Sequence, residues 1–119
     1  MKSILIVDDE LATAEALALI LEDEGYRVSR ASNGLQGLQR ATEDPPDLVI
    51  LDFMMPVMTG AEMASKLRAE AATRQVKIIM NSALGEGAVR EHFAGYDAFL
   101  RKPYTIDKII DAIRGLLDG

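Results

Sequence analysis

In Ile4-Leu-Ile-Val-Asp-Asp9 an unbroken apolar run is followed at once by two acids, and this run sets a pattern that recurs along the chain. Such a run suits a parallel strand that is buried on both faces. The pattern returns in Leu48 to Leu51, in Val76 to Met80 with Lys77 as an interruption, and in Ala98 to Leu100. Between Tyr26 and Ala31, polar residues alternate with Val28, which is typical of an edge strand. We therefore predict five strands.

Amphipathic segments separate these runs and predict helices. Apolar residues recur at helical spacing in the first segment, at Leu11, Ala14, Ala18 and Leu21, and Gly25 is placed to end that helix. Capping residues begin three others, namely Asn33, Thr59 with Glu62 in a capping box, and Thr105. A short helix between Val89 and Ala94 completes the set. Strand and helix thus alternate five times, which predicts one doubly wound α/β domain over residues 1–119.

Composition narrows the classes of function. The chain has 119 residues, of which 49% are apolar, and this is enough for one compact core. A net charge of −6 without a basic patch argues against direct binding of nucleic acid or anionic lipid. The chain has no cysteine, so disulfides and thiolate sites are excluded. Asp8 interrupts the first apolar run too early for a signal core or a membrane span, so we expect a cytoplasmic location.

Polar side chains follow four of the predicted strands at the edge where open α/β sheets bind ligands. Asp8 and Asp9 follow the first, Asp52 the third, Ser82 the fourth and Lys102 the fifth. Taken singly, each has an ordinary explanation as a helix cap, a loop hydroxyl or a surface charge. Their joint occurrence at successive strand ends favours a site.

The chemistry of this set indicates a metal and a phosphoryl group. Clustered carboxylates repel one another and raise their own pKa values unless a cation joins them. Oxygen ligands without histidine or cysteine select a hard ion such as Mg²⁺. A carboxylate beside Mg²⁺ and a lysine is equipped to attack a phosphoryl group.

Four segments together resemble the receiver domains of two-component response regulators, and the resemblance covers the whole chain. They are Ile4 to Glu10, Leu48 to Pro56 with Gly60, Ile78 to Ala83, and Ala94 to Pro103. The resemblance implies a flavodoxin-like parallel sheet with strand order 2-1-3-4-5. It also implies that Asp52 accepts a phosphoryl group from a phosphohistidine on a sensor histidine kinase or a histidine phosphotransfer protein.

The resemblance assigns further roles in the metal site and the switch. Asp9 would bind Mg²⁺ directly, Asp8 mainly through water, and the backbone carbonyl of Met54 would supply another ligand. Lys102 would pair with Asp52 and then with a phosphoryl oxygen, and the Lys102-Pro103 bond would be cis. The Ser82 hydroxyl would bind the phosphoryl group, and Phe99 would turn inward when Ser82 moves.

The sequence departs from the usual family pattern in the switch region. Ser82 stands where threonine is more usual, and Phe99 where tyrosine is common. The stretch from Ser82 to Lys102 is slightly shorter than expected, and the loss falls between Leu84 and Val89. We therefore expect a mobile segment from Leu84 to Ala94 that phosphorylation orders. The unphosphorylated chain is expected to be a monomer, with dimer formation after phosphorylation left open.

Two other functions are weighed against this one. An aspartyl-phosphate phosphohydrolase would need a general acid two residues after the nucleophile, and Met54 stands there. An unphosphorylated interaction module would usually lack one of the site residues, and this chain keeps them all. The expected activity is thus regulatory, limited to self-phosphotransfer and slow self-dephosphorylation, with a downstream protein as partner. The single histidine, His92, is assigned a surface or packing role.

Overall fold

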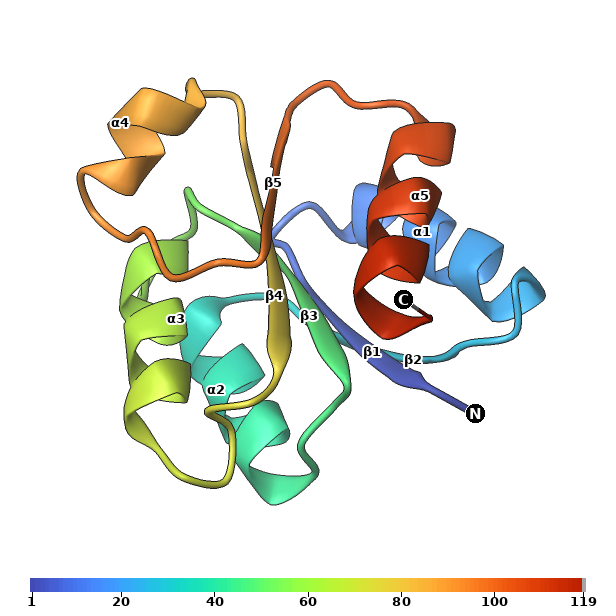
Figure 1. The fold of residues 1–119 in the computed structure, drawn as a ribbon, viewed down its shortest axis with the longest axis horizontal. Coiled ribbons are helices and arrows are strands. Elements are labelled where there is room, and N and C mark those ends of the chain that lie inside the picture. The colour runs from blue at the N-terminus through green and yellow to red at the C-terminus, as the bar shows by residue number, and fades with distance from the viewer. Residues whose placement is uncertain (119) are drawn as a thin grey trace.

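Five parallel strands form one sheet between two layers of helices in the computed structural model, which describes residues 1–118 (Figure 1). The strands are β1 Ser3–Val7, β2 Arg27–Ala31, β3 Leu48–Asp52, β4 Lys77–Ser82 and β5 Ala98–Arg101. The helices are α1 Leu11–Asp23, α2 Gly34–Glu43, α3 Gly60–Ala69, α4 Glu86–Arg90 and α5 Ile106–Leu117. The strand order β2-β1-β3-β4-β5 confirms the predicted doubly wound, flavodoxin-like fold.

The side-chain alternation of the buried strands divides the core into two layers. Ile4, Ile50 and Ile79 point to one face and pack against α1 and α5. Leu51 and Met80 point to the other face, which α2, α3 and α4 cover. Figure 1 shows these two helix layers on opposite sides of the sheet. Because both faces are covered, β1, β3 and β4 are buried along nearly their whole length.

Local signals begin three helices and end a fourth as predicted. The side chains of Asn33, Thr59 and Thr105 each accept a hydrogen bond from a backbone N–H in the first turn that follows. Glu62 completes the capping box of α3. Gly25 has a φ of +98°, a left-handed conformation that glycine adopts without strain, and it follows the end of α1.

Two predictions about the C-terminal half were wrong. The fourth helix was expected from Val89 to Ala94, but α4 spans Glu86–Arg90, because Gly85 serves as its N-cap and the chain leaves the helix before Phe93. The fifth strand was expected to be buried on both faces, but it lies at the edge of the sheet and is half-buried. Its apolar run was too short to distinguish an edge position from a central one.

Other boundaries differ only slightly from the prediction. Strand β2 begins at Arg27 and β4 extends to Ser82, so Asn81 and Ser82 belong to the sheet. The alternation in β2 identified it correctly as an edge strand. Among residues 1–118, no helix has the length and apolar character required to cross a bilayer.

Candidate functional site

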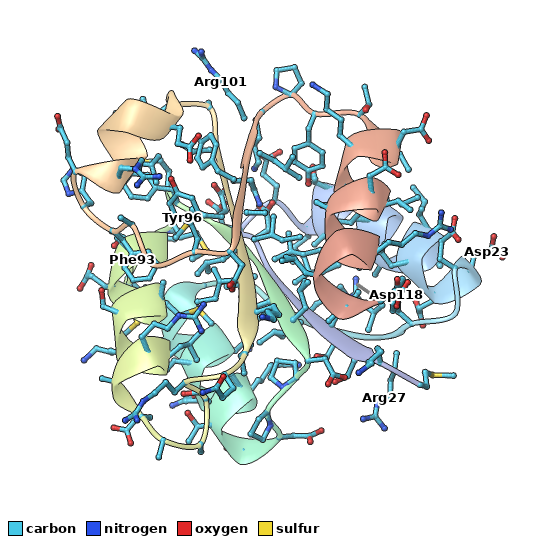
Figure 2. All side chains as sticks on the ribbon, viewed as in Figure 1. Asp23, Arg27, Phe93, Tyr96, Arg101 and Asp118 are labelled. Carbon is cyan, nitrogen blue, oxygen red and sulfur yellow. The ribbon has the colours of Figure 1, made fainter. Side chains whose placement is uncertain are left out.

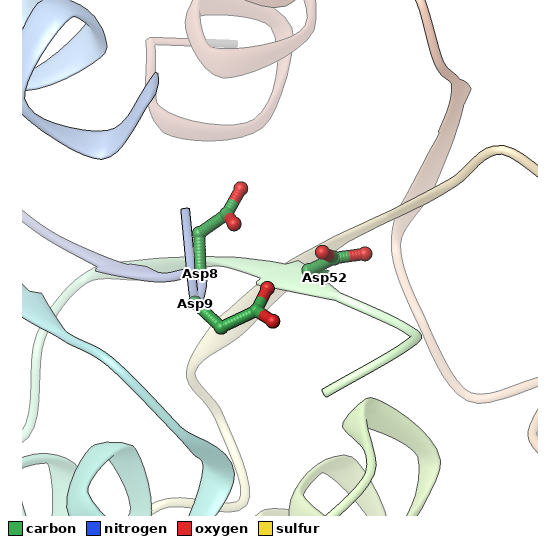
Figure 3. Close-up of side chains that lie close together, drawn as sticks. All are labelled: Asp8, Asp9 and Asp52. Atoms are coloured by element: carbon green, nitrogen blue, oxygen red, sulfur yellow. The ribbon is translucent and has the colours of Figure 1, made fainter. Parts of the chain in front are cut away.

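Three carboxylates meet at the carboxyl edge of the sheet. Strands β1 and β3 are neighbours in a register that pairs Val7 with Leu51, so the residues that follow, Asp8 and Asp52, stand side by side. One carboxylate oxygen from each of Asp8, Asp9 and Asp52 lies within 4.8 Å of the others (Figure 3). Asp8 and Asp52 are each 6% exposed, whereas Asp9 is exposed. The cluster is therefore closed on the sheet side and open toward solvent at Asp9.

Lys102 brings a positive charge to two of these acids from the far edge of the sheet. Its Nζ lies 3.2 Å from Asp52 Oδ2 and 3.4 Å from Asp8 Oδ2. Its backbone N–H donates to the Ser82 carbonyl at 2.8 Å, and the Lys102-Pro103 bond is cis, as predicted. Burial acts to lower the pKa of Lys102, but the Asp52 and Asp8 carboxylates outweigh it and raise that pKa above its ordinary value. The ammonium is thus held in its charged form.

The Lys102 ammonium does not fully offset the effects that raise the pKa of Asp52. Burial raises its pKa, the Lys102 ammonium acts to lower it, and the Asp8 carboxylate raises it again. The net result is a pKa above the ordinary value of 3.8. A second cation at the cluster would favour the ionised form of Asp52.

The donor set fits a hard divalent cation. It consists of carboxylate oxygens, and no histidine or cysteine belongs to the group within the described chain. The one histidine, His92, instead packs its ring against Phe53 at a centroid distance of 5.6 Å, in agreement with the predicted packing role. Met54, the predicted carbonyl ligand, donates its backbone N–H to Asp52 Oδ1 at 3.4 Å and so stays next to the acid.

A tight turn follows Met54 in the loop between β3 and α3. The Met58 N–H donates to the Pro56 carbonyl at 2.8 Å, and Val57 between them has a φ of +71°. This is a γ-turn with a positive φ at its centre, a rare and strained conformation, most of all for a β-branched residue. Val57 is 77% exposed, so packing in the core does not explain why a valine occupies this position.

The two predicted switch residues, Ser82 and Phe99, lie on the face of the sheet that α2, α3 and α4 cover. Met80 is paired with Phe99, and Ser82 follows Met80 on the same side of β4. Ser82 is fully buried, and its Oγ accepts a hydrogen bond from the Leu84 N–H at 3.0 Å. Within the described residues its hydroxyl makes no hydrogen bond to Asp52, so the structure brings the acids and Lys102 together but leaves Ser82 engaged with its own loop.

Sequence reasoning missed one polar residue beside the site. Asn81 stands directly opposite Asp52 in the β3–β4 pairing and is 2% exposed. Its Oδ1 has no hydrogen-bond partner within the described part of the chain. The available signal was a second polar residue, next to Ser82, directly after the apolar run that ends at Met80.

A groove of about 720 Å³ opens next to Lys102 between α1 and α5. Apolar side chains dominate its walls, with Ala16 and Leu17 on one side and Tyr104 and Ile106 on the other. Ala16 and Ile106 are exposed to solvent. The groove therefore offers an apolar surface that adjoins the acid cluster.

Comparison with known proteins places the chain in a family. The model of the response regulator receiver domain matches residues 4–114. The chain is 35% identical to the sporulation initiation phosphotransferase F of Bacillus subtilis, with 98% of this chain and 94% of that protein covered. It is 34% identical to the phosphate regulon transcriptional regulatory protein PhoB of Pseudomonas aeruginosa, where the match covers 98% of this chain and 52% of that protein.

Solved structures agree with the sequence relatives. The response regulator protein TrrA of Thermotoga maritima, in complex with Mg²⁺ and BeF, is 33% identical with a TM-score of 0.89 and covers 98% of this chain and 100% of that one. A signal receiver domain of a histidine kinase from Syntrophus aciditrophicus is 31% identical with a TM-score of 0.92 and covers 100% and 92% of the two chains. The chain spans about half the length of several curated relatives that it matches. By family model, sequence and structure alike, it belongs to the receiver domains of two-component response regulators.

Proposed function

We propose that Asp52 is the phosphoacceptor of this receiver domain and that it takes a phosphoryl group from a phosphohistidine on a sensor kinase or a phosphotransfer protein. The observation that carries the proposal is the contact of Lys102 with Asp52 at 3.2 Å inside a cluster of three carboxylates. A relative named a phosphotransferase, which the chain matches over nearly its whole length, supports the same chemistry.

Asp8, Asp9, Asp52 and the backbone carbonyl of Met54 would hold Mg²⁺, the ion that is present in the TrrA complex. When bound, Mg²⁺ would neutralise charge on the phosphoryl oxygens and on the acids around them. Asp9 is the exposed member of the cluster and would meet the ion from the solvent side. Asp8 is already engaged with Lys102, which supports a less direct role for it.

The residues of the chain perform the transfer by position and charge. A carboxylate oxygen of Asp52 forms the bond to phosphorus while the bond from phosphorus to the imidazole nitrogen of the donor breaks. The Lys102 ammonium, with three donors on a flexible stem, then follows the charge to a phosphoryl oxygen. The Ser82 hydroxyl turns from Leu84 to the same group, and Phe99 fills the space on that face.

The consequence of the transfer is a change of surface rather than turnover of a substrate. The face made by α4, β5 and α5 would carry the signal to a downstream protein, and hydrolysis of Asp52-phosphate would end it. We propose no other enzymatic activity, because Met54 offers no acid at the position that a phosphohydrolase would use. A cytoplasmic location and a monomer before phosphorylation belong to the same proposal, and dimer formation after it stays open.

Mass spectrometry with acetyl phosphate and Mg²⁺ tests the assignment. One phosphoryl group should be added to the wild type and none to Asp52→Asn. An exposed acid on α5 gives the matched control, and Asp111→Asn should be labelled like the wild type. Chelation of Mg²⁺ should stop the labelling, since the acids then repel the donor. Equal labelling of the wild type and Asp52→Asn would refute the phosphoacceptor assignment.

A further inference from the structure

Helix α4 is too short to hold its own position. It has five residues, Glu86–Arg90, and its N-cap Gly85 offers no side-chain hydrogen bond. Gly87 inside the helix adds conformational freedom that must be lost when the helix forms. A single helical turn without outside contacts does not persist in water. Val89 anchors the helix in the core, but the orientation of its first turn depends on contacts with other segments.

Tyr96 supplies such a contact from the segment that leads into β5. Its hydroxyl donates to Glu86 Oε2 at 2.6 Å, and Glu86 is the first residue of α4. Arg90, one turn further along, lies 3.7 Å from the same oxygen. Burial raises the pKa of Tyr96, and the Glu86 carboxylate raises it further, so the phenol keeps the proton that it donates. The first turn of α4 is thereby joined to the approach to β5.

The ring of Tyr96 lies between two other aromatic rings. Its centroid is 6.5 Å from that of Phe93 and 5.9 Å from that of Phe99, with interplanar angles of 51° and 46°. Figure 2 labels Phe93 and Tyr96 below α4, and all three rings pack against the core layer under α2, α3 and α4. Tilted pairs at this separation are attractive. The rings form a continuous row from the end of α4 to the sheet.

Phe99 connects this row of rings to β4, the strand that ends at Ser82. It is paired with Met80 in β4, and Ser82 lies two residues beyond Met80 on the same face. Ser82 and Phe99 therefore lie on the same face of the sheet, on two neighbouring strands. Tyr96 contacts Phe99 with its ring and α4 with its hydroxyl, and so it stands between the two.

We propose that Tyr96 is a positioning residue that couples Phe99 to helix α4, its ring following Phe99 and its hydroxyl holding Glu86. The inference rests on the proposed function, because phosphorylation of Asp52 is what moves Ser82 and Phe99. A shift of Phe99 changes the support of the Tyr96 ring, and with it the strength of the bond to Glu86. Coupling of this kind is reciprocal, so loss of the hydroxyl also alters how strongly the site holds a phosphoryl mimic.

Amide hydrogen exchange of the whole chain, with and without Mg²⁺ and beryllofluoride, tests the coupling. In the wild type, beryllofluoride should slow exchange both near Ser82 and across Glu86 to Arg90. In Tyr96→Phe the ring stays and the hydroxyl is lost, so the slowing across Glu86 to Arg90 should fall by about fivefold, the equivalent of one modest hydrogen bond. The slowing near Ser82 should remain.

Two further variants separate the hydroxyl from general effects. Tyr26→Phe removes a hydroxyl from a tyrosine between α1 and β2 that packs against the core layer on the opposite face of the sheet, so it should respond like the wild type. Glu86→Gln keeps an acceptor and should preserve most of the response, whereas Glu86→Leu should reproduce Tyr96→Phe. The affinity for beryllofluoride should drop in Tyr96→Phe and not in Tyr26→Phe.

The outcomes distinguish the coupling from the function on which it rests. If Tyr96→Phe and the wild type respond alike across Glu86 to Arg90 while Ser82 responds in both, the coupling is wrong and the phosphoacceptor assignment stands. If beryllofluoride changes nothing near Ser82 in the wild type, the proposed function fails and the coupling fails with it.

Discussion

The ammonium of Lys102 lies 3.2 Å from a carboxylate oxygen of Asp52, although the two residues are 50 positions apart in the chain. The order of the sheet makes this contact possible, because β5 and β3 lie on either side of β4. Lys102 therefore reaches across the end of β4 to place its charge on Asp52. The long side chain of Lys102 thus supplies a positive charge to the site from the edge strand β5.

Removal of that charge should slow phosphorylation without unfolding the domain. Lys102→Met keeps most of the aliphatic stem but removes the ammonium that contacts Asp52 and Asp8, so the charge that develops on the phosphoryl oxygens is left to Mg²⁺ alone. We expect labelling by acetyl phosphate to slow by about 100-fold, as for the loss of one electrostatic contact in a transition state. Lys108→Met, at an exposed position on α5, is the control. Similar rates for the two variants would exclude the role given to Lys102.

The raised pKa of Asp52 predicts a pH dependence of stability. In metal-free buffer the folded state binds more protons than the unfolded state between pH 3.8 and the raised folded pKa. The free energy of unfolding should therefore decrease as pH rises through this window. Asp52→Asn lacks the titration, so its stability relative to the wild type should increase with pH. Urea unfolding at several pH values measures the difference, and parallel curves for the two proteins would contradict the burial argument.

Much of the site could be predicted because it depends on strand order alone. Once the apolar runs are read as parallel strands, Asp8, Asp52 and Lys102 must reach one edge. The capping box of α3 and the glycine that follows α1 could be predicted for a similar reason, since each depends on residues a few positions apart. The contact of Tyr96 with Glu86 was not predictable, because it requires the path of the chain after α4, where the expected helix was displaced.

Asn81 illustrates a second limit of the sequence. Its position in the motif gave no reason to separate it from Ser82. The strand register places it opposite Asp52, and its Oδ1 has no hydrogen-bond partner among residues 1–118. A buried acceptor without a partner costs about 1–3 kcal/mol. We therefore expect Asn81→Val to raise the free energy of unfolding by about 1 kcal/mol. Urea unfolding checks this, and a loss of stability would show that the amide has a polar role in the fold.

The lifetime of the phosphorylated state should depend on Met54 and Leu84. Both follow strand ends next to the site, and their side chains are 60% and 44% exposed. Neither can orient a water molecule for attack on Asp52-phosphate, which predicts slow decay. Met54→Asn should accelerate loss of the label by about tenfold, and the apolar control Met54→Leu should leave it unchanged. A decay rate in Met54→Asn equal to that of Met54→Leu would remove this explanation.

We expect a phosphohistidine protein to dock over the groove between α1 and α5, whereas a small phosphodonor needs no docking surface. Ala16 is exposed on its wall, and a long charged side chain there would fill the apolar surface beside Lys102. Ala16→Arg should therefore reduce transfer from a phosphohistidine protein by at least about tenfold, since a charge is placed in a desolvated interface. Labelling by acetyl phosphate should be unaffected, because that donor needs no docking surface. Equal losses with both donors would indicate damage to the site rather than to docking.

Two helical glycines allow the order of α4 to be tested independently of its contacts. Apart from the neighbouring backbone of its own helix, a Cβ atom added at Gly87 in α4 or at Gly115 in α5 would meet no atom within 4 Å, so alanine fits at both positions. Each change should stabilise its helix by about 1 kcal/mol. We expect Leu84 to Ala94 to exchange rapidly in the unmodified wild type, because a short glycine-containing helix opens easily. Gly87→Ala should slow that exchange before any phosphoryl mimic is added and should reduce the further slowing by beryllofluoride, whereas Gly115→Ala should change neither. Strong protection of Leu84 to Ala94 already in the unmodified wild type would show that α4 is preformed and that phosphorylation moves it instead of ordering it.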